Sequence, residues 1–181
     1  MGGITIVDCL RGGLSTTISA IADAYFKPGA PLLADAITLL PYYGARSLNG
    51  LITEALENGR GVFIASLTSN PEGMSLQTAL RQSGDYKGRT VAYGIASTAQ
   101  KHNVDIEGMG SVGLIIGATI GQWMQDSGVV PRLRLAGCRG QGSENRVPRY
   151  ARQRAGHRVP LYRLAWAGYR RTEPSHRVDC A

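Results

Sequence analysis

Hydrophobic residues along the chain gather in four short runs that are separated by longer stretches of mixed polarity. The runs are Gly3 to Val7, Asp35 to Leu40, Gly61 to Leu67 and Ser111 to Ile116. Each run is almost continuously apolar, as in strands that are covered on both faces, and the intervals between runs leave room for a helix. The pattern predicts an α/β fold in which the four strands lie parallel and adjacent, in chain order, with right-handed helical crossovers.

Two of the intervening stretches predict helices. Apolar residues follow the spacing i, i+3, i+4, i+7 and i+8 at Leu48, Leu51, Ile52, Ala55 and Leu56, and Gly59 comes after them. This spacing is typical of an amphipathic helix that ends at a glycine. A second helix is expected near Val91 to His102, after a polar loop that begins at Met74. The loop is either a solvated connection or a lid over a site.

Turn-forming residues follow the predicted strands directly. Pro41 follows the second strand, Ser69 to Gly73 follow the third, and Gly117 to Thr119 follow the fourth. Parallel α/β folds bind their ligands at the carboxyl ends of the strands. We therefore expect Asp8, Ser69 and Thr119 to lie at one edge of the sheet.

Length and composition narrow the class of protein. The chain has 181 residues, of which 43% are hydrophobic, enough for one domain with a core. No apolar run approaches the ~18 residues that span a bilayer, so a cytoplasmic protein without a membrane partner is expected. The three cysteines, Cys9, Cys138 and Cys180, are widely spaced and indicate neither a disulfide framework nor a metal site.

The net charge of +7 comes from the end of the chain. Residues 131–181 hold 12 arginines, no lysine and 3 acidic residues, and they form an arginine-rich tail beside a first region at 1–130. Tyr150, Tyr162, Trp166 and Tyr169 are interleaved with these arginines, as in surfaces that stack on nucleic acid. The lack of lysine and of helical periodicity fits a reading-frame change or a decayed gene better, so nucleic acid is not expected as a partner.

Four segments of the first region together resemble the actinobacterial type of orotidine 5′-phosphate decarboxylase. They are Ile6 to Thr17, Ala34 to Thr38 with Pro41 to Gly44, Leu67 to Gly73, and Val112 to Thr119. In the tail, Gly137 to Gly142 is similar to the family's G-x-G-x-Q-G, with Arg139 at a glycine. Val159 to Arg163 is similar to the last strand of the family's barrel.

The resemblance implies a (β/α)8 TIM barrel. Such a barrel takes about 250 residues, and the similarity begins at the family's D-x-K-x-x-D strand. Two earlier strands, which carry a ribose-binding aspartate and a second lysine, have no counterpart. We therefore expect an incomplete barrel of about six parallel strands, whose last two β/α units are the degraded tail. The family needs no cofactor or metal and forms homodimers.

The family converts orotidine 5′-phosphate to UMP and carbon dioxide in pyrimidine biosynthesis, and its D-x-K-x-x-D motif carries the chemistry. Asp8 retains the first, catalytic aspartate, but Leu10 stands at the lysine and Gly13 at the second aspartate. Leucine can neither carry a positive charge nor donate a proton. The chain is therefore expected to be a carboxy-lyase by family with impaired catalysis.

Four residues match the positions at which the family binds its substrate. By resemblance, Thr17 retains the motif threonine, Ser69 reads the pyrimidine ring, and Gln141 and Arg163 hold the phosphate. Each also has a plainer interpretation: Asp8 as a carboxylate that caps nearby amides, Ser69 as a turn residue, Gln141 and Arg163 as surface residues. The alternatives to an impaired enzyme are a non-catalytic binder of UMP-like nucleotides and a decayed gene product without function.

Overall fold

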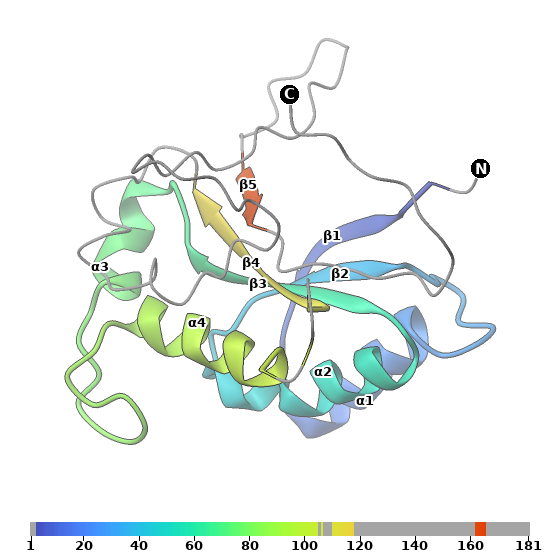
Figure 1. Cartoon of the computed structure of the whole chain (residues 1–181), viewed down its shortest axis with the longest axis horizontal. Coiled ribbons are helices and arrows are strands. Elements are labelled where there is room, and N and C mark those ends of the chain that lie inside the picture. The colour runs from blue at the N-terminus through green and yellow to red at the C-terminus, as the bar shows by residue number, and fades with distance from the viewer. Residues whose placement is uncertain (1–2, 105, 107–109, 118–161, 166–181) are drawn as a thin grey trace, which may run out of the picture.

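The structure is a computed structural model that describes residues 3–104, 106, 110–117 and 162–165 (Figure 1). Its strands are β1 (Ile6–Arg11), β2 (Ala36–Leu39), β3 (Gly61–Leu67), β4 (Val112–Gly117) and β5 (Tyr162–Ala165). Its helices are α1 (Ser15–Tyr25), α2 (Asn49–Glu57), α3 (Met74–Gln77) and α4 (Val91–His102), with 3-10 turns η1 (Ala45–Leu48) and η2 (Pro71–Gly73).

The strands form one sheet in the order β1-β2-β3-β4-β5. β1, β2, β3 and β4 pair in parallel, in chain order, which confirms the four predicted strands and their arrangement. β5 instead runs antiparallel to β4, with Arg163 opposite Ile116. Four of the about six expected parallel strands are therefore described, and the correction concerns β5 alone, which is not parallel. A strand that pairs with the edge of a sheet can form hydrogen bonds with the edge strand's backbone in either the parallel or the antiparallel direction. The sequence of a short run such as Tyr162–Ala165 therefore does not specify its direction.

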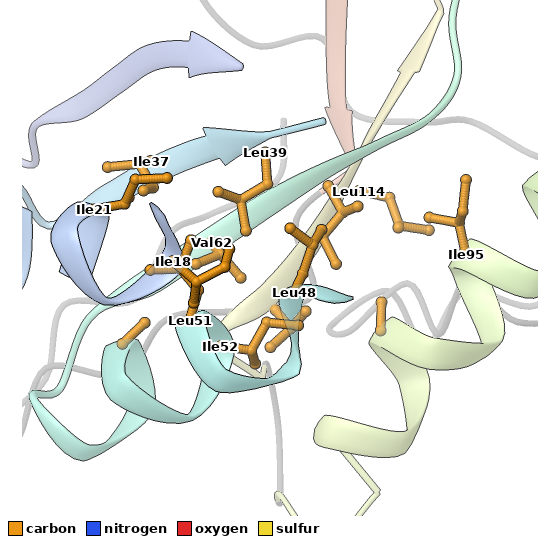
Figure 2. Close-up of a cluster of buried hydrophobic side chains, with 14 of the residues drawn as sticks. Ile18, Ile21, Ile37, Leu39, Leu48, Leu51, Ile52, Val62, Ile95 and Leu114 are labelled. Atoms are coloured by element: carbon orange, nitrogen blue, oxygen red, sulfur yellow. The ribbon is translucent and has the colours of Figure 1, made fainter. Parts of the chain in front are cut away.

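The helices α1, α2 and α4 cover one face of the sheet (Figure 1), and the larger of the two buried apolar clusters lies between them and the sheet. Figure 2 shows the resulting cluster, in which Ile37 of β2 lies beside Ile21 of α1, and Leu39 of β2 lies above Leu51 and Ile52 of α2 in this view. The opposite face carries a small cluster of Ala36, Phe63, Ala65 and Ile115 with Ile6 beside it. Alternate residues of a strand point to opposite faces, so the nearly continuous apolar runs serve both clusters.

The two predicted helices are confirmed as α2 and α4. Gly59 follows α2 with φ +65°, a left-handed conformation that suits a helix stop. Thr90 caps α4 by accepting a hydrogen bond of 3.1 Å from Tyr93 N. The predicted polar loop between them is more ordered than expected, since it contains α3 and an antiparallel bridge between Leu80 and Thr90.

Asp35 joins three segments at the start of β2. Its Oδ2 accepts a hydrogen bond of 2.8 Å from Thr5 N, and its Oδ1 lies 3.0 Å from Arg60 NH1. The pair is mostly buried, with 17% of the Asp35 side chain and 24% of the Arg60 side chain exposed. These two interactions of Asp35 link the residues that immediately precede β1, β2 and β3.

Within the described segments, no helix has the length and apolar character needed to cross a membrane.

Candidate functional site

Asp8 and Ser69 lie toward the carboxyl-terminal side of the parallel sheet. Asp8 is in β1, beside Thr38 of β2, and Ser69 is the second residue after β3. The third residue expected at this edge, Thr119, lies outside the described residues.

The hydroxyl of Thr38 connects β2 to two positions of the D-x-K-x-x-D motif. Its Oγ1 donates a hydrogen bond of 2.7 Å to Asp8 Oδ1 and accepts one of 2.9 Å from Leu10 N. Thr38 is buried, with 3% of its surface exposed, whereas Asp8 is exposed. A buried group thus fixes the orientation of a carboxylate that remains open to solvent. Sequence reasoning missed Thr38, although a polar residue within an apolar strand was the available signal.

β1 loses its regular pairing around the motif. Val7 pairs with Ile37 and Arg11 with Leu39, so three residues of β1 stand against one of β2. Leu10 lies within this irregularity and has φ +44°, which is uncommon for a residue other than glycine. In a regular strand residues 8 and 10 would point to the same face, but this alternation does not hold through the irregular pairing. The Leu10 side chain is 46% exposed.

The remaining motif positions are close-packed against their neighbours. A Cβ added to Gly12 would collide with the carbonyl oxygen of Leu40, so glycine alone fits there. A Cβ added to Gly13 would lie 2.7 Å from Cβ and Cγ2 of Thr17, which is exposed in the first turn of α1. The fold thus brings Gly13 and Thr17 together, but it leaves no room for a larger side chain at position 13 without movement of Thr17.

The turn that holds Ser69 packs against the end of β4. A Cβ added to Gly117 would lie 2.5 Å from Ser69 N and 2.8 Å from the Thr68 carbonyl carbon. Ser69 itself is half-buried. The missing side chain at Gly117 therefore permits the close approach of the Ser69 turn to the neighbouring strand.

The two expected phosphate ligands are not both placed by the structure. Gln141 lies outside the described residues, and Arg163 is placed only through its backbone in β5. Their juxtaposition with Ser69 stays a prediction.

No cation pairs with the Asp8 carboxylate among the residues that the structure describes. The ion pairs in this part of the chain join Lys27 to Asp23, Arg60 to Asp35 and Lys101 to Asp85. The same residues contain no group of three or more metal-ligating side chains. The described site therefore consists of an oriented carboxylate, backbone turns and hydroxyl groups.

Comparison with known proteins shows the same family as the motifs. The profile of the family described as orotidine 5′-phosphate decarboxylase / HUMPS matches residues 18–160. Orotidine 5′-phosphate decarboxylase of Salinispora arenicola is 41% identical over 129 residues, covering 71% of this chain and 45% of that protein. The enzyme of Streptomyces coelicolor is 36% identical over 143 residues, covering 78% and 50%.

Solved structures agree with these relatives. A crystal structure assigned to orotidine 5′-phosphate decarboxylase of Streptomyces avermitilis superposes with a TM-score of 0.64 at 36% identity, covering 71% of this chain and 44% of that one. The OMP decarboxylase of Leishmania donovani gives 0.52 at 33% identity, covering 70% and 44%. The chain thus spans about half the length of the relatives it matches, and the expected α/β class of the (β/α)8 barrel is confirmed. The chain belongs to the orotidine 5′-phosphate decarboxylase / HUMPS family.

Proposed function

We propose that this chain carries an orotidine 5′-phosphate decarboxylase site that binds a pyrimidine nucleotide but is impaired in decarboxylation. The observation that carries the proposal is the arrangement of the motif: Asp8 is retained and oriented by Thr38, while Leu10 occupies the lysine position.

Decarboxylation breaks the bond between C6 of the pyrimidine and the carboxylate carbon, and the electron pair stays on C6. A nearby ammonium stabilises this charge and then supplies the proton that forms the C6–H bond. Leu10 supplies neither charge nor proton. Loss of a general acid costs about 10²- to 10⁴-fold in rate, and loss of the electrostatic stabilisation adds to this.

Nucleotide binding uses other groups than decarboxylation. In the proposed site Ser69 contacts the pyrimidine ring, Thr17 lies beside the motif, and Gln141 and Arg163 hold the phosphate. The half-buried position of Ser69 at the end of β3 supports the first role, because this edge of a parallel sheet is where ligands bind. A guanidinium suits a phosphate dianion through paired hydrogen bonds.

The proposal is tested by two measurements on the full 181-residue chain. Release of carbon dioxide from orotidine 5′-phosphate should not exceed that of a buffer blank, and UMP should raise the melting temperature. Turnover at the rate of a family enzyme would show that impairment is wrong. Absence of both turnover and a thermal shift would favour the other interpretation, a gene product without function.

The proposal includes a homodimer. Five large apolar side chains near the ends of β1 and β2 are at least 44% exposed: Leu10, Leu14, Leu40, Tyr42 and Tyr43. Exposed apolar groups gathered on one side of a protein are typical of an interface. Sedimentation velocity should give the mass of two chains, and replacing Tyr42 with Asp should shift the protein to the monomer. A monomer at micromolar concentration in the unmodified chain would contradict this part of the proposal.

A further inference from the structure

The turn after β3 is held by a side chain from another element. The Gln77 amide at the end of α3 reaches back to Thr68, the residue that precedes Ser69. Gln77 Oε1 accepts a hydrogen bond of 2.8 Å from Thr68 N, and Gln77 Nε2 donates one of 2.9 Å to Thr68 Oγ1. One amide thereby satisfies both a backbone and a side-chain group of Thr68, which fixes the direction in which the chain enters Ser69.

Two glycines make this arrangement possible. A Cβ at Gly73 would lie 2.8 Å from Gln77 Nε2 and 3.4 Å from Thr68 Oγ1, so the amide occupies the space that a side chain would fill. On the other side, the backbone of Ser69 packs against Gly117. The Ser69 turn is therefore enclosed between the Gln77 amide and the end of β4, with contacts that leave little freedom of position.

We propose that Gln77 is a positioning residue that sets the selectivity of the site for the pyrimidine ring. The inference rests on the proposed function, in which Ser69 contacts the ring. A hydrogen-bonding group gives selectivity only if it is held within a fraction of an ångström of its partner, and a turn residue has no rigid element of its own. Gln77 supplies that rigidity through Thr68. In the proposed function the phosphate is held by Gln141 and Arg163, which are not part of this turn.

The test compares two ligands that differ in the base. UMP carries the pyrimidine ring, and ribose 5-phosphate has the sugar and phosphate alone. Titration calorimetry on the full chain should show that Gln77→Met weakens UMP binding about 10-fold, the effect of roughly one net hydrogen bond. Affinity for ribose 5-phosphate should stay within about 2-fold of the unmodified chain.

Matched variants separate positioning from general damage. Gln77→Glu keeps an acceptor for Thr68 N and should retain most of the selectivity. Gln82→Met makes the same change at an exposed glutamine, whose amide donates a hydrogen bond of 3.1 Å to the carbonyl of Leu80, and should change neither affinity. Equal weakening of UMP and ribose 5-phosphate by Gln77→Met would overturn the inference.

If the unmodified chain binds neither ligand, the proposed function itself fails. A second measurement then still tests whether Gln77 holds the turn. Hydrogen exchange of the Thr68 amide reports the contact directly, because that N–H donates to Gln77 Oε1. Gln77→Met should accelerate this exchange at least ~10-fold, and Gln82→Met should not. Unchanged exchange at Thr68 would show that Gln77 does not hold the turn.

Discussion

Thr38 Oγ1 donates a hydrogen bond of 2.7 Å to Asp8 Oδ1, and thereby joins a buried residue of β2 to the exposed carboxylate of β1. The same oxygen accepts from Leu10 N at 2.9 Å. One hydroxyl therefore supports both the retained aspartate and the left-handed residue at the lysine position.

Replacing Thr38 with Val should destabilise the protein by about 1 to 3 kcal/mol. The shape is kept, but the part-buried Leu10 N–H loses its acceptor and Asp8 loses its donor. Urea unfolding measures the change. Thr53→Val, at an exposed position of α2, is the matched control and should lie within about 0.5 kcal/mol of the unmodified protein. Equal effects of the two substitutions would contradict the role of the hydroxyl.

Replacing Gly13 with Asp should also destabilise, by about 1 to 3 kcal/mol, because the new Cβ would lie 2.7 Å from the Thr17 side chain. Adding Thr17→Gly should recover part of this loss, since it removes both colliding carbons, Cβ and Cγ2. Thermal unfolding of the two single variants and the double variant gives the interaction energy between positions 13 and 17. Simple additivity would show that Thr17 is not the obstacle.

Restoring both motif residues, as Leu10→Lys with Gly13→Asp, should not raise decarboxylation to the rate of family enzymes. Position 10 has φ +44° and a 46% exposed side chain, so a lysine there is not held against Asp8 as it would be in a regular strand. Catalysis by charge requires a preorganised geometry. The measurement is carbon dioxide release from orotidine 5′-phosphate, and family-like turnover by this double variant would show that the irregular pairing of β1 is compatible with catalysis.

Replacing Asp35 with Ala should cost about 1 to 3 kcal/mol, because it leaves the mostly buried Arg60 guanidinium without its acceptor and removes the hydrogen bond to the exposed Thr5 N–H. Asp35→Asn retains an acceptor for Thr5 and should cost less. Guanidinium chloride unfolding distinguishes the two. If the alanine variant is as stable as the asparagine variant, the interactions of Asp35 with Thr5 and Arg60 do not stabilise the fold.

Stability should fall as the pH drops below about 6.5, in part through His102. Burial lowers the pKa of His102 from its ordinary value of 6.5, so the unfolded chain takes up a proton at a higher pH than the folded protein does. The contribution is fully present above pH 6.5 and is lost as the pH falls through the lowered pKa. From pH 7.5 to 5, the melting temperature of the unmodified chain should fall more steeply than that of His102→Gln. Parallel curves would exclude His102 as the cause.

The sequence by itself predicted the four parallel strands, the helices α2 and α4, and the family. These features depend on patterns within one segment: a continuous apolar run for a buried strand, apolar residues at helical spacing before Gly59, and motifs read residue by residue. Asp8, Thr17 and Ser69 were predicted as site residues in the same way, since the type of residue at each motif position is a property of the sequence alone.

Only the tertiary structure decided how those positions are held. Thr38 and Asp8 are 30 residues apart, Arg60 and Asp35 are 25, and Gln77 and Thr68 are 9, so no local pattern reports these contacts. The same holds for two backbone features that depend on pairing with a neighbouring strand. They are the antiparallel direction of β5 and the irregular pairing of β1 in which Leu10 has a left-handed backbone. Hydrogen-bonding groups of a chain accept any partner of suitable geometry, and folding selects one by packing many segments at once.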